Sequence, residues 1–223
     1  MSLPTHPTLN RRRLMSGTLA LGATSLLLPM PAHAQTGSAD RVITPAQTAG
    51  PYYPESFPAD VDEDLVRLRG LDARATGTVT HIRGRVLSLD GRPMAGAQVE
   101  IWQCDANGRY LHPRDRGGKP RDTAFQGYGR TLCRADGSYS FRTIRPVAYP
   151  GRTPHIHFAV TPQGGGSLVT QMYVAGEPLN ERDGLYASLR DPRQRAALTV
   201  RLEPAHGVEE GALAGTFDIV LAG

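Results

Sequence analysis

The most chemically suggestive stretch of the chain is Pro154-His155-Ile156-His157-Phe158. In a β-strand, side chains two positions apart point to the same face. His155 and His157 would therefore present two imidazoles side by side, while Ile156 and Phe158 would face the interior. Such a pair can bind zinc, copper or iron. Because an H-x-H pair also occurs in structural roles, it indicates a metal only when further ligands join it.

Two tyrosines supply the further candidates. No acidic residue lies between Asp136 and Glu177, so the carboxylate that commonly completes a ferrous site is missing near the histidines. Tyr149 stands a few residues upstream, and Tyr110 closes the segment 105–110. Phenolate is a hard anionic donor that suits Fe(III) better than Fe(II) or Zn(II). Tyrosine is more often a core or rim residue, so spacing alone leaves this ligand set open.

The elements that would carry these residues are mostly strands. Short β-branched and alternating runs, separated by Gly- and Pro-rich turns, predict an all-β fold, an antiparallel β-sandwich. Asp90-Gly91-Arg92-Pro93 is turn chemistry, and Ala135-Asp136-Gly137 predicts a hairpin. The one helical stretch, 185–195, is interrupted by Pro192. The expected strands are 78–89, 97–103, 130–133, 139–144, 155–161, 168–174, 198–202 and 216–221.

Two long loops lie beside the candidate ligands. One runs from Asp105 to Tyr128 and the other from Arg145 to Pro154. Loops of this size in a compact sandwich are usually functional. We therefore expect them to form the active site.

The N-terminus looks like a targeting segment. Arg11-Arg12-Arg13 precedes the uncharged apolar run 14–28, and Ala32-His33-Ala34 offers a signal-peptidase site. The paired arginines favour the twin-arginine route, with an ordinary secretory signal or a retained anchor as the alternatives. We expect cleavage near Ala34, a periplasmic or secreted protein and no membrane span in the mature chain.

The remainder divides into an irregular N-terminal arm, residues 35–75, and a sandwich domain, residues 76–223. Removing residues 1–34, which hold three arginines and no acidic residue, lowers the formal net charge from +4 to +1. The basic balance of the whole chain therefore gives no case for nucleic-acid binding.

Cys104 and Cys133 are the two cysteines of the chain. In an oxidising compartment they could form one disulfide, which would close a loop of about thirty residues around Tyr110 and stabilise the fold by roughly 3 to 4 kcal/mol. The alternative is two separate buried thiols. A disulfide requires Cα atoms closer than about 7 Å.

Four stretches together resemble the intradiol ring-cleavage dioxygenases, and most of all the iron-bearing beta chain of protocatechuate 3,4-dioxygenases. The resemblance covers nearly the whole expected mature chain, and its spaced signature includes Gly84, Val86, Gly91, Met94, Val99-Glu100-Ile101, Gly108 and Tyr110. The stretches are 48–54, 84–110, 127–158 and 170–173, and residues 217–221 look like the last strand of the family.

The resemblance implies one Fe(III) per chain, held by Tyr110, Tyr149, His155 and His157. Tyr149 would be the axial tyrosinate that leaves the iron when substrate binds, and it would accept a substrate proton. Arg152 would face the bound substrate and stabilise negative charge, and Gln171 would lie near the same pocket. The implied partners are a small aromatic diol and O2. The implied product, a cis,cis-muconate, arises by cleavage between the two hydroxyl-bearing carbons.

The chain also departs from the family. The stretch between Tyr149 and His155 is shorter than in larger members, which carry a tryptophan-containing insert there, so recognition of a substrate carboxylate is open. The helical dimerisation region of catechol and hydroxyquinol dioxygenases has no counterpart, which leaves a homo-oligomer as one of several assembly states. The main alternative function is a non-enzymatic, transthyretin-like binding module. Cleavage outside the diol would need a carboxylate ligand that no motif here provides.

Overall fold

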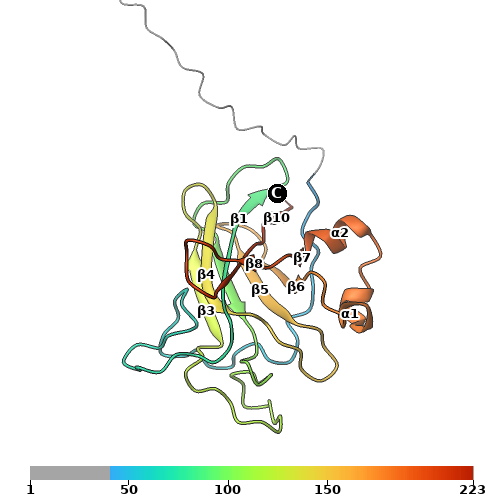
Figure 1. Cartoon of the computed structure of the whole chain (residues 1–223). Helices are drawn as coiled ribbons and strands as arrows, with labels where there is room; N and C mark the ends of the chain where they lie inside the picture. Colours follow the sequence, from blue (N-terminus) through green and yellow to red (C-terminus); the bar gives the residue numbers. More distant parts are fainter. Residues whose placement is uncertain (1–40, 223) are drawn as a thin grey trace, which may run out of the picture. The chain divides into compact units, whose positions relative to one another are not determined.

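The computed structural model describes residues 41–222, and these form two β-sheets with two short α-helices at one side (Figure 1). One sheet has the strand order β10-β1-β9-β8, with β4 paired to the other edge of β1; the second has the order β3-β2-β5-β6-β7. The strands are β1 Val79–Ser88, β2 Gln98–Trp102, β3 Tyr128–Leu132, β4 Ser138–Ile144, β5 His155–Thr161, β6 Leu168–Val174, β7 Thr199–Val200, β8 Glu203–Pro204, β9 Leu213–Thr216 and β10 Ile219–Leu221.

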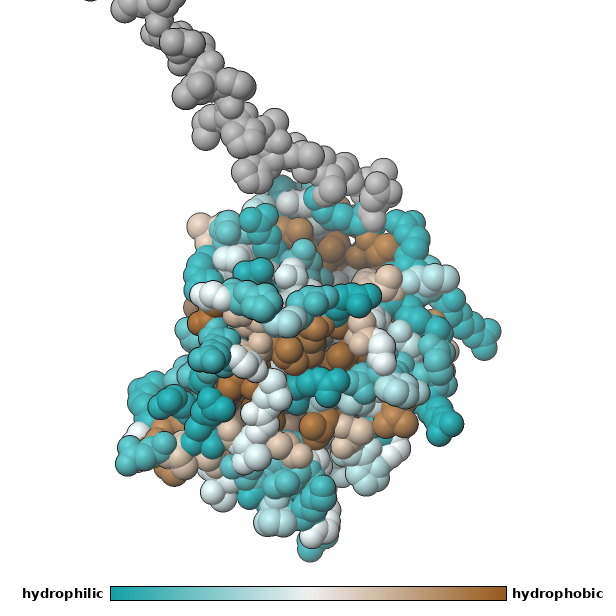
Figure 2. All heavy atoms as spheres, in the orientation of Figure 1, coloured by the Kyte–Doolittle hydropathy of each residue, from teal (hydrophilic) through white to brown (hydrophobic). Residues whose placement is uncertain are grey.

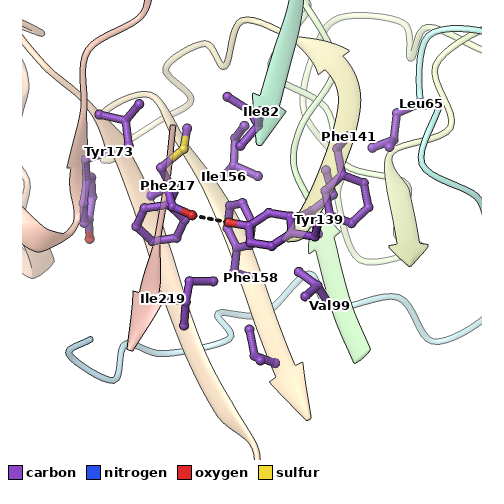
Figure 3. Close-up of a cluster of buried hydrophobic side chains, with 14 of the residues drawn as sticks. Leu65, Ile82, Val99, Tyr139, Phe141, Ile156, Phe158, Tyr173, Phe217 and Ile219 are labelled. Atoms are coloured by element: carbon purple, nitrogen blue, oxygen red, sulfur yellow. Dashed lines mark hydrogen bonds between the residues drawn. The ribbon is translucent and has the colours of Figure 1, made fainter. Parts of the chain in front are cut away.

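The main core lies between the two sheets (Figure 3). Ile82 of β1 and Phe141 of β4 come from one sheet, while Val99 of β2 and Phe158 of β5 come from the other, and all are almost fully buried. The hydroxyl of Tyr139 donates a hydrogen bond to the carbonyl oxygen of Phe217, which joins β4 to the segment between β9 and β10. Burial of this apolar surface is the main force that holds the two sheets together.

The second sheet is covered on its outer face as well. Along β2 and β5, side chains alternate between the main core and a second cluster that contains Trp102, Tyr110 and Tyr128. Tyr52 and Tyr53, from the irregular arm, pack against this second cluster. Both faces of the sheet are therefore buried, which explains why β5 is buried at every position but its last. The outer face carries the candidate site.

The predicted sandwich is confirmed, and each expected strand overlaps an observed one. Three short pairings, β1 with β9, β1 with β10 and β6 with β7, are parallel rather than antiparallel. The expected last strand, 216–221, is divided at 217–218 into the end of β9 and β10. Residues 41–78 carry no helix or regular strand, as expected for the arm, whereas residues 1–40, with the expected signal segment, lie outside the described residues.

The predicted hairpin around Asp136 is wrong. A tight turn does form, since Gly137 donates its N–H to the carbonyl of Arg134. However, β3 pairs with β2 in one sheet and β4 pairs with β1 in the other. The turn therefore carries the chain from one sheet to the other, because the inward side chains of β4 are needed on the opposite side of the core.

The predicted interruption of the helical stretch is confirmed. Two short helices form, α1 Gly184–Ala187 and α2 Pro192–Ala197, after a 3-10 turn at Asn180–Arg182. Pro192 begins α2, where its missing N–H costs nothing. Asp183 and Asp191 accept backbone N–H groups and cap the two helices.

The disulfide considered for Cys104 and Cys133 is not formed, and both are free buried thiols. Strands β2 and β3 are neighbours, as assumed, but their antiparallel register pairs Gln98 with Leu132 and Trp102 with Tyr128. Cys133 follows Leu132 at one end of the strand pair, while Cys104 follows Trp102 at the other. At about 3.3 Å per residue the cysteines are roughly 20 Å apart, far beyond the reach of a disulfide.

On the face seen in Figure 2, hydrophilic side chains dominate the periphery and apolar side chains gather near the middle. The exposed large apolar side chains include Phe57 on the arm and Leu132 on β3. Within the described residues, none of the helices has the length and apolar character needed to cross a membrane.

Candidate metal centre

Strand β5 brings His155 and His157 together as predicted. Both are almost fully buried on the outer face of the sheet, and their Nε2 atoms lie 3.2 Å apart. Register with the neighbouring strands places Trp102 beside His157 and Gln171 on its other side. The indole of Trp102 stacks on the His157 ring, with centroids 4.8 Å apart and planes within 5°.

A tight turn places Tyr149 next to Arg152. Pro150 and Gly151 occupy its centre, Gly151 has a φ of 81°, and the N–H of Arg152 donates to the carbonyl of Tyr149 over 2.9 Å. Proline followed by a residue of positive φ is the pattern of a type II turn, which explains the glycine. As a result, an Arg152 Nη1 group lies 3.4 Å from the hydroxyl oxygen of Tyr149.

A second tight turn presents Tyr110. The carboxylate of Asp105 accepts the N–H groups of Asn107 and Arg109, and Gly108 between them has a φ of 76°. A Cβ on Gly108 would lie 3.3 Å from the carbonyl oxygen of Ala148, so this glycine also allows the two ligand turns to approach each other. The main chain of Tyr110 is fixed by its N–H, which donates to Asp115 over 2.6 Å.

The two turns and the strand gather all four predicted ligands into one cluster. Ring centroids are 5.4 Å apart for Tyr110 and Tyr149, 6.1 Å for Tyr110 and His157, 5.5 Å for Tyr149 and His155, and 4.8 Å for the two histidines. Tyr110 is buried, whereas Tyr149 is half-buried at the open side. The structure thus brings together the four side chains named as candidate ligands, and their binding of a metal stays a prediction.

Burial keeps the free side chains of the cluster neutral. It lowers the pKa of His155 to about 4 and that of His157 well below its ordinary value. It also raises the pKa values of Tyr110 and Tyr149. Neutral imidazoles are ready to ligate a metal, and a buried phenol loses its proton most readily to a bound cation.

The polar atoms of the cluster fit a bound cation. The hydroxyl of Tyr110 is buried with no hydrogen-bond partner among the described residues, and the Nε2 atom of His157 faces that of His155. Nδ1 of His155 lies 2.6 Å from the carbonyl oxygen of Thr153, an arrangement that leaves its Nε2 lone pair facing the cluster. Among the described residues no group of three or more His, Cys, Asp or Glu could hold a metal, so such a site depends on the tyrosines.

Arg152 is fixed by a network that the sequence did not reveal. Its Nε donates to Asp183 over 2.7 Å and its Nη2 donates to Gln171 over 2.5 Å. Burial is the largest single effect on the pKa of Arg152 and would lower it, but the hydrogen bond to Asp183 and the electrostatic attraction of Asp183 and the neighbouring tyrosines together raise that pKa. Gln171 in turn donates to the carbonyl of Thr48 over 2.8 Å. Gln171 therefore lies beside the site, as predicted, and links Arg152 to the N-terminal arm.

Sequence reasoning missed three residues of the site. Asp183 is buried and belongs to the helical segment, about thirty residues after Arg152, so no local spacing linked them. Tyr52 stacks on Tyr110 with ring centroids 4.9 Å apart, and Trp102 stacks on His157. The Thr48–Pro54 segment was noted only as part of a resemblance, and its position over the ligands follows from the fold.

Comparison with known proteins shows the family of the chain. Residues 48–223 match the protein family described as Dioxygenase. The chain is 38% identical over 183 residues to the protocatechuate 3,4-dioxygenase beta chain of Burkholderia cepacia, covering 78% of this chain and 77% of that protein. It is 29% identical over 162 residues to the catechol 1,2-dioxygenase of Candida albicans, covering 65% of this chain and 51% of that enzyme.

A solved structure shares the architecture. The dioxygenase domain of a dioxygenase and carbohydrate-binding protein fusion from Streptomyces sp. SirexAA-E superposes with a TM-score of 0.61 at 32% identity, over 81% of this chain and 99% of that domain. Sequence, fold and relatives thus agree on one class of oxidoreductase, which opens catechol-type rings with O2. The chain belongs to the intradiol ring-cleavage dioxygenase family.

Proposed function

We propose that this enzyme binds one Fe(III) per chain through Tyr110, Tyr149, His155 and His157, and cleaves a catechol-type ring between its two hydroxyl-bearing carbons. The observation that carries the proposal is the convergence of buried Tyr110 and half-buried Tyr149 with two buried histidines, beside a fixed arginine, with the hydroxyl of Tyr110 left without a hydrogen-bond partner among the described residues. One hard trivalent cation matches two anionic phenolates and two neutral imidazoles. When bound, the ion would act as a Lewis acid for the diol and make the ring reactive toward O2.

The residues of the chain then have distinct tasks. Tyr149, half-buried at the open side, would be a phenolate when the cation is bound, and its Oη could then accept a proton from a substrate hydroxyl to give the neutral phenol. Tyr110, beneath Tyr52, stays in place as a permanent ligand. Arg152, held by Asp183 and Gln171, presents a fixed positive charge to negative charge that develops on substrate oxygens.

In the overall reaction one ring carbon–carbon bond breaks and both atoms of O2 enter the product. The product is a dicarboxylic acid of the cis,cis-muconate type. Tyr52 stacks on Tyr110 and Trp102 stacks on His157, so that aromatic surface covers two of the donors and excludes water, which would otherwise compete with the diol and weaken electrostatic stabilisation.

The first test is metal analysis of the purified protein. We expect about one iron per chain, a high-spin ferric resonance and a visible absorption band from tyrosinate coordination, because two phenolates and two imidazoles suit a single Fe(III) ion. A transthyretin-like binding module would be colourless. Stoichiometric zinc without iron would disprove the proposal.

The second test compares single substitutions of the two tyrosines. Tyr110→Phe should lower iron content most and remove part of the visible band, because Tyr110 is buried and is proposed to stay bound to the iron when substrate binds. Tyr149→Phe should keep more iron but slow the loss of substrate protons. Tyr186→Phe is the control, since Tyr186 is a buried tyrosine outside the donor cluster. Parent-like colour and turnover in both ligand variants would reject the assignment.

We also infer export of the enzyme to the periplasm or medium. The support is the sequence of residues 1–34 alone, with its basic, apolar and small-residue segments. A twin-arginine route is consistent with a protein that takes up its metal while folding in the cytoplasm.

A further inference from the structure

A small cleft opens beside the candidate metal centre. Its volume is about 150 Å³, and Tyr149 and Arg152 form one side of it. Leu179, Arg182 and Asp183, from the segment before α1, form the other side. A protein cavity of about 150 Å³ is large enough to hold benzene. One substituted aromatic ring can therefore reach from the donor cluster toward this segment.

The charges of this segment are almost all paired. Glu177 forms an ion pair with Arg145, Glu181 lies 3.4 Å from Arg195, and Asp183 binds Arg152. Each acidic side chain of residues 177–183 thus forms an ion pair with an arginine from outside the segment.

Arg182 is the exception. It is exposed at the cleft, and no hydrogen bond or ion pair of its side chain is present within residues 41–222. Arg182 therefore places at the cleft a positive charge with no carboxylate partner, because the nearby carboxylate of Asp183 is already paired with Arg152.

We propose that Arg182 determines substrate specificity by binding an anionic substituent, a carboxylate, on the ring diol. The proposal rests on the proposed function, since it assumes that the diol edge of the ring lies at the four donors. The far side of the ring then contacts Leu179, whose side chain is 39% exposed, and the carboxylate meets the guanidinium of Arg182. A guanidinium can bind a carboxylate with two parallel hydrogen bonds.

The stretch between Tyr149 and His155 is short, so residues 179–183, which line the same cleft, would supply the recognition of a carboxylate. Because Arg182 is exposed, solvent screens the interaction, and its effect on selectivity is modest.

The test measures kcat/KM for 3,4-dihydroxybenzoate and for catechol in the parent enzyme and in Arg182→Gln, Arg182→Lys and Arg182→Glu. The ratio of kcat/KM for 3,4-dihydroxybenzoate to kcat/KM for catechol should fall about fivefold in Arg182→Gln. It should fall further in Arg182→Glu and be largely kept in Arg182→Lys. Arg190→Gln is the matched control, because Arg190 is also exposed but does not line the cleft, and its ratio should equal that of the parent.

A binding measurement separates this proposal from the proposed function. The dissociation constants of 4-hydroxybenzoate and phenol, neither of which is a ring diol, are measured for the parent and Arg182→Gln. In Arg182→Gln we expect the dissociation constant of 4-hydroxybenzoate to rise about fivefold and that of phenol to stay unchanged. If no ring diol is cleaved but the dissociation constant of 4-hydroxybenzoate rises, the proposed function is wrong and the role of Arg182 in anion binding is supported. If the ratio and the constants are unchanged in Arg182→Gln, the role of Arg182 is wrong.

Discussion

At the scale of single residues, the site depends on side chains that are each held in place by a neighbour. Without Asp183, Arg152 would keep only Gln171 as a strong hydrogen-bond partner, and the carboxylate of Asp183 also accepts the N–H of Thr153 over 2.9 Å. Asp183 therefore joins the ligand turn to the start of α1. A charged, buried acceptor of this kind strengthens its hydrogen bonds and fixes their geometry.

We predict that Asp183→Asn lowers kcat/KM by about ten- to a hundredfold, because small displacements of a positioned group are costly in catalysis. Asparagine caps a helix about as well as aspartate, so α1 should remain and the free energy of unfolding should fall by only about 1 to 3 kcal/mol. Steady-state kinetics and denaturant unfolding measure the two effects.

The control is Asp191→Asn, because Asp191 caps α2 in the same way but does not contact the site. It should match the parent in both measurements. Equal activity in Asp183→Asn and the parent would show that Arg152 needs no such partner.

At the scale of elements, close contact between β1 and the segment before β10 holds the first sheet together. A Cβ on Gly84 would lie 1.9 Å from the carbonyl oxygen of Phe217, a distance that no side chain can occupy. The carbonyl of Phe217 also accepts the hydroxyl of Tyr139. The glycine in β1 is therefore required by the approach of a neighbouring backbone.

We predict that Gly84→Ala lowers the free energy of unfolding by about 3 kcal/mol or more, since the clash is with backbone that cannot turn aside. For a domain of this size the melting temperature should fall by roughly 10 °C. Gly166→Ala is the control, because a Cβ there meets nothing within 4 Å. A melting temperature within a degree of the parent for Gly84→Ala would contradict the packing described here.

At the scale of the whole molecule, one ion-pair network ties together segments far apart in sequence. Arg142 of β4 donates to Glu209 over 2.7 and 2.9 Å, and to Asp64 of the arm over 3.0 and 3.1 Å. His81 of β1 lies 3.0 Å from Glu209, and Arg74 lies 3.9 Å from it. The hydrogen bonds from Arg142 are the main reason that the pKa of Glu209 falls to about 2.

This network predicts a loss of stability in acid. The folded pKa of Glu209 lies below its ordinary value of 4.5, so its contribution is present above about pH 4.5 and is lost as the pH falls toward 2. The side chain is 26% exposed, so solvent screening limits the contribution to about 1 kcal/mol. The difference in melting temperature between the parent and Glu209→Gln should therefore shrink steadily between pH 5 and pH 2. A constant difference would exclude this linkage.

Export is also a property of the whole molecule. If the twin-arginine route is used, changing Arg11 and Arg12 together to Lys should leave a folded, iron-loaded precursor inside the cell. Arg13→Lys, outside the pair, is the control and should be exported. Cell fractionation with metal analysis measures both. Normal export of the double variant would reject the route but not the enzyme.

The sequence by itself determined the features that depend on local spacing. The two-residue period of a strand places His155 and His157 on one face and Ile156 and Phe158 on the other, whatever the partner strands are. Pro150-Gly151 has the residue pattern of a type II turn, although the turn itself was not predicted. The resemblance carried by the stretches 84–110 and 127–158 implied the roles of Tyr110 and Tyr149, which spacing alone left open.

Only the tertiary structure decided features that depend on register and on contacts between distant segments. The antiparallel register of β2 and β3 separates Cys104 from Cys133, and the two-sheet core sends β3 and β4 apart instead of forming a hairpin. The contacts of Asp183 with Arg152 and of Tyr52 with Tyr110 likewise join segments about thirty and sixty residues apart. Local sequence could not predict them, because such pairs are selected by burial of the whole core and outer cluster rather than by the preferences of either segment.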